Sequence, residues 1–293
     1  MKRLLLIPKI RVQNANALSS PYTIGFPAMT AWLGAVHALE RKLRSRQFDE
    51  LHFNGMAVVC HQIDMQTYKG NGDYVHSIIG TGNPLDKQGN RPSFIEEARC
   101  HLNVSLVIEY TGVDQDEMPE LLSAITTIMH SGHKMAAGDI LAFDEPMALK
   151  VIDEKDHRAL MRKLMPGHCL IERSELLRSA MEDGQDAIDA LLDYLKIYNS
   201  SEQNEQGDVS WSARRKTPGW IVPIATGFHG LSSLGQAASQ RDPETPHRFA
   251  ESVITLGEFI MPYRIDEPDQ MLWRYHVDPE NDLYLCQQNK STH

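Results

Sequence analysis

The chain has 293 residues, 42% of them hydrophobic and 23% charged, so it can bury a large core and has an ordinary soluble-protein composition. No apolar run is long enough to cross a bilayer. Residues 4–7 follow Lys2 and Arg3 as in a signal peptide, but this run is too short and Pro8 and Lys9 end it. Four scattered cysteines without C-x-x-C spacing predict reduced thiols in the cytoplasm and argue against a zinc ribbon or a disulfide scaffold.

The formal net charge is −10, whereas proteins that bind nucleic acid alone are usually basic. The charge is unevenly distributed, however. Basic residues cluster at 2–11, 41–46 and 214–216, and acidic residues gather at 114–120 and 182–193. A short bound nucleic acid would need few ionic contacts if partner subunits shared the load.

The first 43 residues predict a strand, a polar loop and a long amphipathic helix. An apolar run at 4–7 continues into alternating apolar and basic residues, and from Pro27 the apolar residues recur at helical spacing. The predicted loop at 13–25 contains neutral donors, namely Asn14, Asn16, Ser19, Ser20 and Thr23. With the helix N-terminus they could bind phosphate, or the loop could simply cap its own helix. No G-x-x-x-x-G-K-[ST] or G-x-G-x-x-G pattern supports a nucleotide cofactor.

A second strand is predicted at 51–60, followed by an excursion at 62–94 that is rich in glycine, asparagine and proline. We interpret the excursion as a hairpin or a mobile loop. The next strand, 98–110, alternates strictly, with Leu102, Val104, Leu106 and Ile108 on one face and Arg99, His101, Asn103 and Ser105 on the other. The polar face is either an open surface of the kind that meets RNA or ordinary sheet packing.

The remaining elements follow in chain order. They are a helix opened by Pro119, a helix over 175–198 that Gly184 can divide, a flexible connector at 199–208, a strand at 220–225, an apolar segment of ambiguous period at 249–263, and a polar tail from 266 packed along an edge. His130 and His133 lack a third ligand and are interpreted as ordinary polar residues, so neither a metal nor a cofactor is expected.

Several stretches together resemble one known family. They are IRVQNANALSSP at 10–21, GFP at 25–27, GAVHAL at 34–39, VCH at 59–61, EEARCHL at 96–102, GDIL at 138–141, GWIVPI at 219–224 and RDPETP at 241–246. This set is similar to the crRNA 5′-handle-binding subunit, the second Csy protein, of the type I-F CRISPR surveillance (Cascade) complex, in the RAMP superfamily. The similar stretches span almost the whole chain in the right order, so the resemblance is specific.

The resemblance implies an α+β RAMP fold, with a ferredoxin-like, RRM-type palm and a protruding thumb hairpin. Residues 1–293 would form a single RAMP domain, with 62–94 as the thumb insertion. The implied function is that of a non-catalytic antiviral-defence subunit that binds the 5′ handle of crRNA. It would pair with the large Csy subunit, abut the backbone Csy subunit and serve double-stranded DNA targeting only indirectly.

One departure from the family pattern concerns its glycine loop, which usually carries paired glycines. Here the turn reads Ala136-Ala137-Gly138 and keeps only the last glycine. Because alanine disfavours positive φ, this turn is not expected to cradle a phosphate.

The residues predicted to bind RNA are amides and hydroxyls that read base edges, aromatic residues that stack on bases, and basic residues that pair with phosphates. They are Arg11, Gln13, Asn14, Asn16, Ser19, Ser20, Tyr22, Arg99, His101, Lys134, Trp211, Arg214, Arg215 and Arg248. Among them Asn14, Asn16, Arg11 and Arg248 are expected to contact the handle.

Two other functions stay open at this point. One is a metal-independent endoribonuclease that processes repeat RNA, with His37, His61 or His101 and Lys134 as general acid and base. The other is a scaffold that docks the large subunit through an exposed apolar tail at 272–275 and the segment around Phe259.

Overall fold

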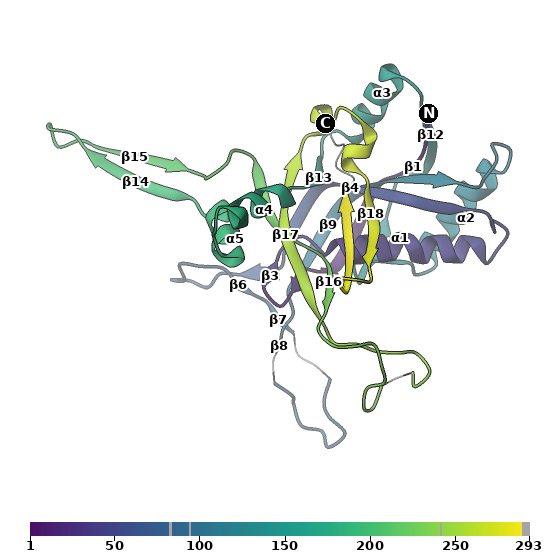
Figure 1. Ribbon diagram of the computed structural model, residues 1–293, viewed down its shortest axis with the longest axis horizontal. Helices are drawn as coiled ribbons and strands as arrows, with labels where there is room; N and C mark the ends of the chain where they lie inside the picture. Colours follow the sequence, from purple (N-terminus) through teal and green to yellow (C-terminus); the bar gives the residue numbers. More distant parts are fainter. Residues whose placement is uncertain (82–83, 94, 241, 289–293) are drawn as a thin grey trace.

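The computed structural model describes residues 1–81, 84–93, 95–240 and 242–288, and in it most strands join one antiparallel sheet (Figure 1). Three long strands form its first half, β1 (Lys2–Asn16), β9 (Arg99–Thr111) and β4 (His52–Met65), with β9 in the middle. Three short strands lie beyond β1: β11 (Gly138–Ala142), β10 (Lys134–Met135) and β12 (Met147–Val151). The expected α+β class is confirmed.

One face of this half-sheet is covered by helices α1 (Met29–Arg44) and α2 (Met118–His130). The predicted alternation along β9 is confirmed, because Leu102 and Leu106 are buried in the same core as Trp32 of α1 and Ile125 of α2. Helix α1 begins two residues after Pro27, and α2 carries Pro119 in its first turn, as the sequence predicts.

The opposite face is covered along only part of its length. Leu4, Val59 and Val107 are buried there beneath helix α3 (Glu154–Leu164), whose N-terminus is capped by the Asp153 carboxylate accepting from the Asp156 amide. Farther along the same strands the apolar residues give way to polar ones. Within the described residues, this stretch of the sheet is therefore not covered by a helix.

The second half of the sheet contains β13 (His168–Glu172), β17 (Ala250–Ile260), β16 (Trp220–Gly230), β19 (Leu283–Gln288) and β18 (Trp273–Asp278) in that spatial order. Strand β18 returns to β4 through the pairing of Trp273 with Met56, which closes these strands into a ring. Two 3₁₀ turns, η1 (Pro262–Arg264) and η2 (Pro268–Met271), lead into β18.

The expectation of an exposed apolar tail at 272–275 is wrong for Leu272 and Trp273, whereas Tyr275 is 39% exposed. Leu272 and Trp273 are fully buried, and the Trp273 indole donates to the Leu170 carbonyl at 2.9 Å. Phe259 is also buried, at 7% exposure. Trp273 and Phe259 belong to the core that includes Trp32 of α1, and Leu272 belongs to the core beneath α3, because the tail pairs into the sheet on both sides instead of lying along one edge.

The predicted break at Gly184 is confirmed, with φ at +88°, between α4 (Ser174–Glu182) and α5 (Ala187–Leu195). Both helices pack on β16 and β17, where Leu177 and Tyr194 meet Ile221 and Leu256. The segment of ambiguous period is therefore a strand, β17, covered by these helices.

The expectation of a flexible connector at 199–208 is wrong. Strands β14 (Tyr198–Gln203) and β15 (Val209–Arg214) form a two-stranded hairpin that extends far from the sheet (Figure 1). Its tip is a turn in which the Gly207 amide donates to the Asn204 carbonyl, with Gly207 at φ +90°. The hairpin carries few apolar residues, so the pattern used to recognise strands is absent there.

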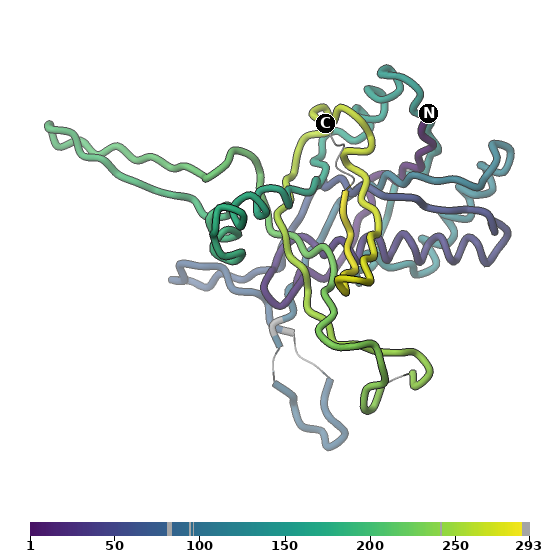
Figure 2. Tube along the Cα trace, in the orientation of Figure 1, coloured from purple at the N-terminus to yellow at the C-terminus, as the bar shows by residue number. Residues whose placement is uncertain are grey.

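The excursion predicted at 62–94 begins later than expected, since Gln62 still belongs to β4. Two short ladders follow, β5 (Thr67–Tyr68) with β6 (Ser77–Ile78) and β7 (Gly80–Thr81) with β8 (Ile95–Glu96). Figure 2 shows this segment leaving the body of the protein. Residues 82–83, 94, 241 and 289–293 lie outside the described residues, and the assignment of the thumb to 62–94 stays a prediction.

Candidate nucleic-acid interface

The uncovered stretch of the sheet collects polar side chains from three adjacent strands. On it Arg11 of β1 lies opposite Asn103 of β9, Asn103 opposite Gln62 of β4, and His101 opposite Asp64. We call this surface the polar face, formed by Arg11, Gln13, Gln62, Asp64, His101 and Asn103. Of the two interpretations of the β9 polar positions, the structure supports an open surface at His101 and Asn103, whereas Ser105 is fully buried.

Strand β1 reaches this surface through two irregularities in its pairing with β9, between Ile7 and Ile10 and between Val12 and Ala15. Lys9 and Asn14, with φ of +52° and +55°, lie within them. The expectation of a polar loop at 13–16 is therefore wrong, because these irregularities let β1 continue to Asn16. The backbone N–H of Asn14 donates to His101 Nδ1 at 3.1 Å, which leaves the ring proton of the neutral imidazole on Nε2.

A cavity of about 300 Å³ opens on the polar face and is lined by all six of its residues together with Leu141. The side chains of Arg11, Gln13 and Gln62 make no hydrogen bond or ion pair within the described residues. Asp64 accepts only from the Gln66 amide at 3.3 Å, and the buried Asn103 Oδ1 has no partner in the described chain.

Of these groups only the Asn103 Oδ1 is buried, and a buried unpaired oxygen is normally satisfied by protein, water or ligand. Arg11, Gln13, Gln62 and Asp64 are exposed and accessible to a ligand. The guanidinium and amides can bind phosphate or base edges, and the carboxylate of Asp64 can accept from base amino groups. The polar face is therefore suited to a single-stranded nucleic acid.

At the covered end of the polar face, Lys9, His61 and Ser105 form a cluster. The Ser105 hydroxyl accepts from the Lys9 amide at 3.0 Å and lies 2.7 Å from His61 Nε2. Lys9 Nζ lies 3.0 Å from His61 Nδ1, which also contacts the Pro166 carbonyl. Burial lowers the pKa of both Lys9 and His61, so desolvation favours their neutral forms.

The donor-rich loop that was predicted to bind RNA satisfies most of its own groups. The strands β2 (Leu18–Ser20) and β3 (Thr23–Ile24) form a small hairpin. In it Thr23 Oγ1 lies 2.8 Å from Ser19 Oγ and 2.7 Å from Ser20 Oγ. The Asn16 amide donates to and accepts from the backbone of Leu18. Tyr22, at the tip, is 76% exposed.

The basic residues of the prediction are dispersed. Arg99 pairs with Glu97 at 2.7 Å, Lys134 pairs with Asp139, and Arg248 pairs with Asp282 at 2.6 Å in the region of the β16–β17 loop. Trp211 and Arg214 lie on the β14–β15 hairpin, and Arg215 follows it; all are exposed. The structure thus brings together Arg11, Gln13, Asn14 and His101, and it does not join the hairpin residues or Arg248 to them.

The Ala136-Ala137 turn adopts the positive φ that alanine was expected to avoid, and the expectation that it does not cradle a phosphate stays a prediction. These residues connect β10 to β11 as a two-residue hairpin and adopt φ of +47° and +65°. A tight turn of this kind demands positive φ at both positions, and the pairing on either side imposes it on alanine. The Ala136 carbonyl accepts from the backbone N–H of Asn16 at 2.8 Å, which joins the turn to the end of β1.

The sequence analysis missed Gln62, Asp64 and Asn103 as members of the site. Asn103 was recognised as polar but was left out of the predicted contacts, and the other two were assigned to the excursion. The alternation of Ile63 and Met65 with Gln62 and Asp64 was the available signal, since it continues the period of β4.

The structure places the histidines of the catalytic and metal-binding alternatives in different surroundings. His61 lies beside Lys9 and not beside Lys134, and His37 is exposed on α1. His133 is buried, which lowers its pKa to about 4, and the His130 ring lies 4.6 Å from that of Phe143. Within the described residues no group of three or more His, Cys, Asp or Glu could hold a metal ion.

None of the helices in the described residues has the length and apolar character needed to span a membrane. The model of the family described as CRISPR-associated protein (Cas_Csy2) matches residues 5–286. The CRISPR-associated protein Csy2 of Pseudomonas aeruginosa (strain UCBPP-PA14) is 36% identical over a 309-residue alignment that covers 96% of this chain and 94% of the relative. The resemblance noted in the sequence is thereby confirmed, and the chain belongs to the CRISPR-associated Csy2 family.

Proposed function

We propose that this chain is a non-catalytic RNA-binding subunit of the cytoplasmic type I-F CRISPR surveillance complex. It binds the 5′ handle of crRNA, pairs with the large Csy subunit and abuts the backbone Csy subunit. Target DNA is then read by base pairing with the guide and not by this chain. Membership of the Csy2 family supports the assignment to this system.

The order of the elements supports a RAMP fold with a ferredoxin-like palm. Along the chain the first half runs β1, α1, β4, β9, α2 and then β11 and β12, and in space the strands follow the order β11–β1–β9–β4 with both helices on one face. This order matches a β-α-β-β-α-β arrangement, and neither α1 nor α2 covers the opposite face, which α3 covers only in part.

The polar face carries the proposal. It places the unpaired Arg11 guanidinium among amides, where it can meet a phosphate while Gln13 and Asn103 meet base edges. An acidic chain with net charge −10 can bind RNA in this way because the contacts are local and the rest of its surface is left to partner subunits.

The test uses the complex reconstituted from the full chain, the other Csy subunits and crRNA. In an electrophoretic shift assay, Arg11→Ala combined with Gln13→Ala should weaken retention of crRNA at least about tenfold, because a phosphate contact and a base-edge contact are lost together. Protection of the 5′ handle from nuclease should decrease in parallel. Arg158→Ala, on the exposed surface of α3, is the matched control and should leave both readouts unchanged. Unchanged protection in the double variant would remove the assignment of the polar face.

The non-catalytic part of the proposal is tested separately. Purified chain incubated with repeat RNA in the absence of metal is expected to give no site-specific product. Site-specific cleavage that disappears in His61→Ala would instead establish the endoribonuclease, since His61 and Lys9 are the adjacent candidates for proton transfer.

A further inference from the structure

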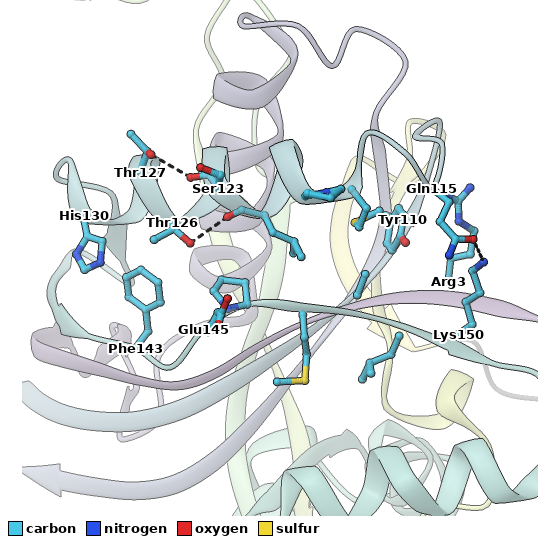
Figure 3. A pocket seen from close by; sticks show the side chains of 17 residues that line it. Arg3, Tyr110, Gln115, Ser123, Thr126, Thr127, His130, Phe143, Glu145 and Lys150 are labelled. Atoms are coloured by element: carbon cyan, nitrogen blue, oxygen red, sulfur yellow. Dashed lines mark hydrogen bonds between the residues drawn. The ribbon is translucent and has the colours of Figure 1, made fainter.

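A second and larger cavity lies between α2 and β12. It is a groove of about 1200 Å³ that shares no lining residue with the cavity on the polar face. Figure 3 shows Ser123, Thr126 and Thr127 on the helical side of the groove, Arg3 and Lys150 near one end, and Phe143 and His130 toward the other, with Glu145 between them. The proposed binding of RNA leaves this groove unexplained.

The interior of the groove is mainly apolar. Met118, Leu122, Phe143, Pro146 and Ala148 line it. The hydroxyls that also line it do not call for a ligand, because Thr126 donates to the Leu122 carbonyl and Thr127 to the Ser123 carbonyl, each at 2.9 Å. An occupant would therefore bring apolar side chains to the middle of the groove.

The strand that forms one wall has a free edge. Within the described residues β12 pairs only with β1, from Met147 opposite Leu6 to Val151 opposite Lys2. Alternate residues of β12 consequently direct backbone N–H and C=O groups away from β1 with no strand to receive them. Such an edge is a template for an added strand, and its five residues offer roughly 17 Å of pairing.

Side chains of opposite charge line different parts of the groove. At one end Lys150 Nζ lies 2.6 Å from the neutral Gln115 Oε1, and Arg3 donates to the Val113 carbonyl with its guanidinium carbon 4.9 Å from the Tyr110 ring centre. Within the described residues neither cation has a carboxylate partner, and the buried Arg3 Nε has no partner at all.

Farther along the groove, before Phe143 and His130, Glu145 is exposed, and it makes no ion pair or hydrogen bond in the part of the chain that the structure describes. The unpaired cations therefore favour an acidic group at one end of an occupant, and Glu145 favours a basic group farther along it.

We propose that an extended segment of another protein subunit adds as a strand to the free edge of β12, beneath α2. The segment has apolar residues at its centre, a carboxylate near Arg3 and Lys150, and a basic group near Glu145. Main-chain pairing then supplies the affinity, and these charges set its direction and register. The inference rests on the proposed function in one respect, because it takes the partner from the same Csy complex.

The test measures access to the groove in the full chain, alone and in the reconstituted complex. All four native cysteines are buried, so Ser123→Cys introduces a selective site for a maleimide. Labelling should be at least tenfold slower in the complex than in the isolated chain, and amide hydrogen exchange over 147–151 should slow as well. Ser179→Cys, exposed on α4, is the control and should label equally in both states.

Three outcomes would overturn the inference. They are equal labelling in both states, slow labelling produced by crRNA alone, and slow labelling of the isolated chain that depends on its concentration, which would indicate a second copy.

A second variant does not require the isolated chain. Lys150→Glu should lower the amount of partner subunit retained at raised salt at least fivefold, whereas Lys155→Glu on α3 should not. The crRNA retained by the complex is measured in the same samples. A negative result for the groove can then be distinguished from a negative result for RNA binding at the polar face.

Discussion

The hairpin at residues 18–24 and the polar face differ in how their polar side chains are used. In the hairpin the hydroxyl of Thr23 is shared by Ser19 and Ser20. On the polar face Arg11 and Gln13 make no side-chain contact of this kind within the described residues. Both regions are rich in donors, but on the polar face several remain unpaired within the described residues, so the number of donors in a segment does not by itself identify a candidate binding site.

The largest effect is expected where the polar face depends on close backbone packing. A Cβ on Gly138 would lie 2.6 Å from the Val12 side chain and 2.7 Å from the Gln13 carbonyl oxygen. Gly138→Ala should therefore lower the free energy of unfolding by about 3 kcal/mol and displace Gln13. Denaturant unfolding measures this, with Gly34→Ala in α1 as the control. No atom lies within 4 Å of the Gly34 Cβ position, so that variant should gain about 0.5–1 kcal/mol. If Gly138→Ala were as stable as the parent, the close contact of Gly138 with Val12 and Gln13 would not be needed to hold the polar face in place.

The next effect concerns His133, which is buried on the helix-covered side of the sheet, whereas His101 on the polar face is partly exposed to solvent. Burial lowers the pKa of His133 to about 4, below the 6.5 of the unfolded chain. Unfolding then takes up a proton between these values, so the free energy of unfolding falls as the pH drops from about 6.5 toward 4. We expect this group to contribute a loss of about 2 kcal/mol between pH 7 and pH 5. His133→Gln should reduce the slope of stability against pH, and an unchanged slope would show that His133 is not the group responsible.

The smallest effects compare the hairpin and the polar face directly. Thr23→Ala removes two hydrogen bonds and should cost about 1–2 kcal/mol of unfolding free energy, with crRNA retention changed less than about twofold. Gln13→Ala should show the reverse, with stability within about 0.5 kcal/mol of the parent and retention several-fold weaker. Thermal unfolding and the shift assay on the same two variants decide this. If Thr23→Ala weakened retention more than Gln13→Ala, the hairpin and not the sheet would be the RNA contact.

Much of the fold could be predicted because its signals are local. The alternation along β9, the helical period from Met29 and the division at Gly184 follow from the spacing of apolar residues or from one glycine. The β14–β15 hairpin could not be predicted in this way, since its strands are polar and exposed. The burial of Trp273 was missed because it depends on β18 returning to β4, a contact between segments more than 200 residues apart.

The candidate site was predicted in part. Arg11, Gln13, Asn14 and His101 were expected and lie together, whereas Arg248 was expected with them and lies elsewhere, paired with Asp282. A sequence shows which residues can donate or accept, but it does not show which of them already have a partner across the sheet.

By itself the sequence determined the family, the α+β class and the strands and helices whose apolar residues repeat at a fixed spacing. Those properties are carried by neighbours along the chain or by the order of the stretches that resemble the family. Only the tertiary structure decided that β1, β9 and β4 share one uncovered polar surface, and that β12 keeps a free edge beside α2. Both depend on strand order and on which faces the helices cover, because the free energy of burying or pairing a polar group is set by residues distant in the sequence.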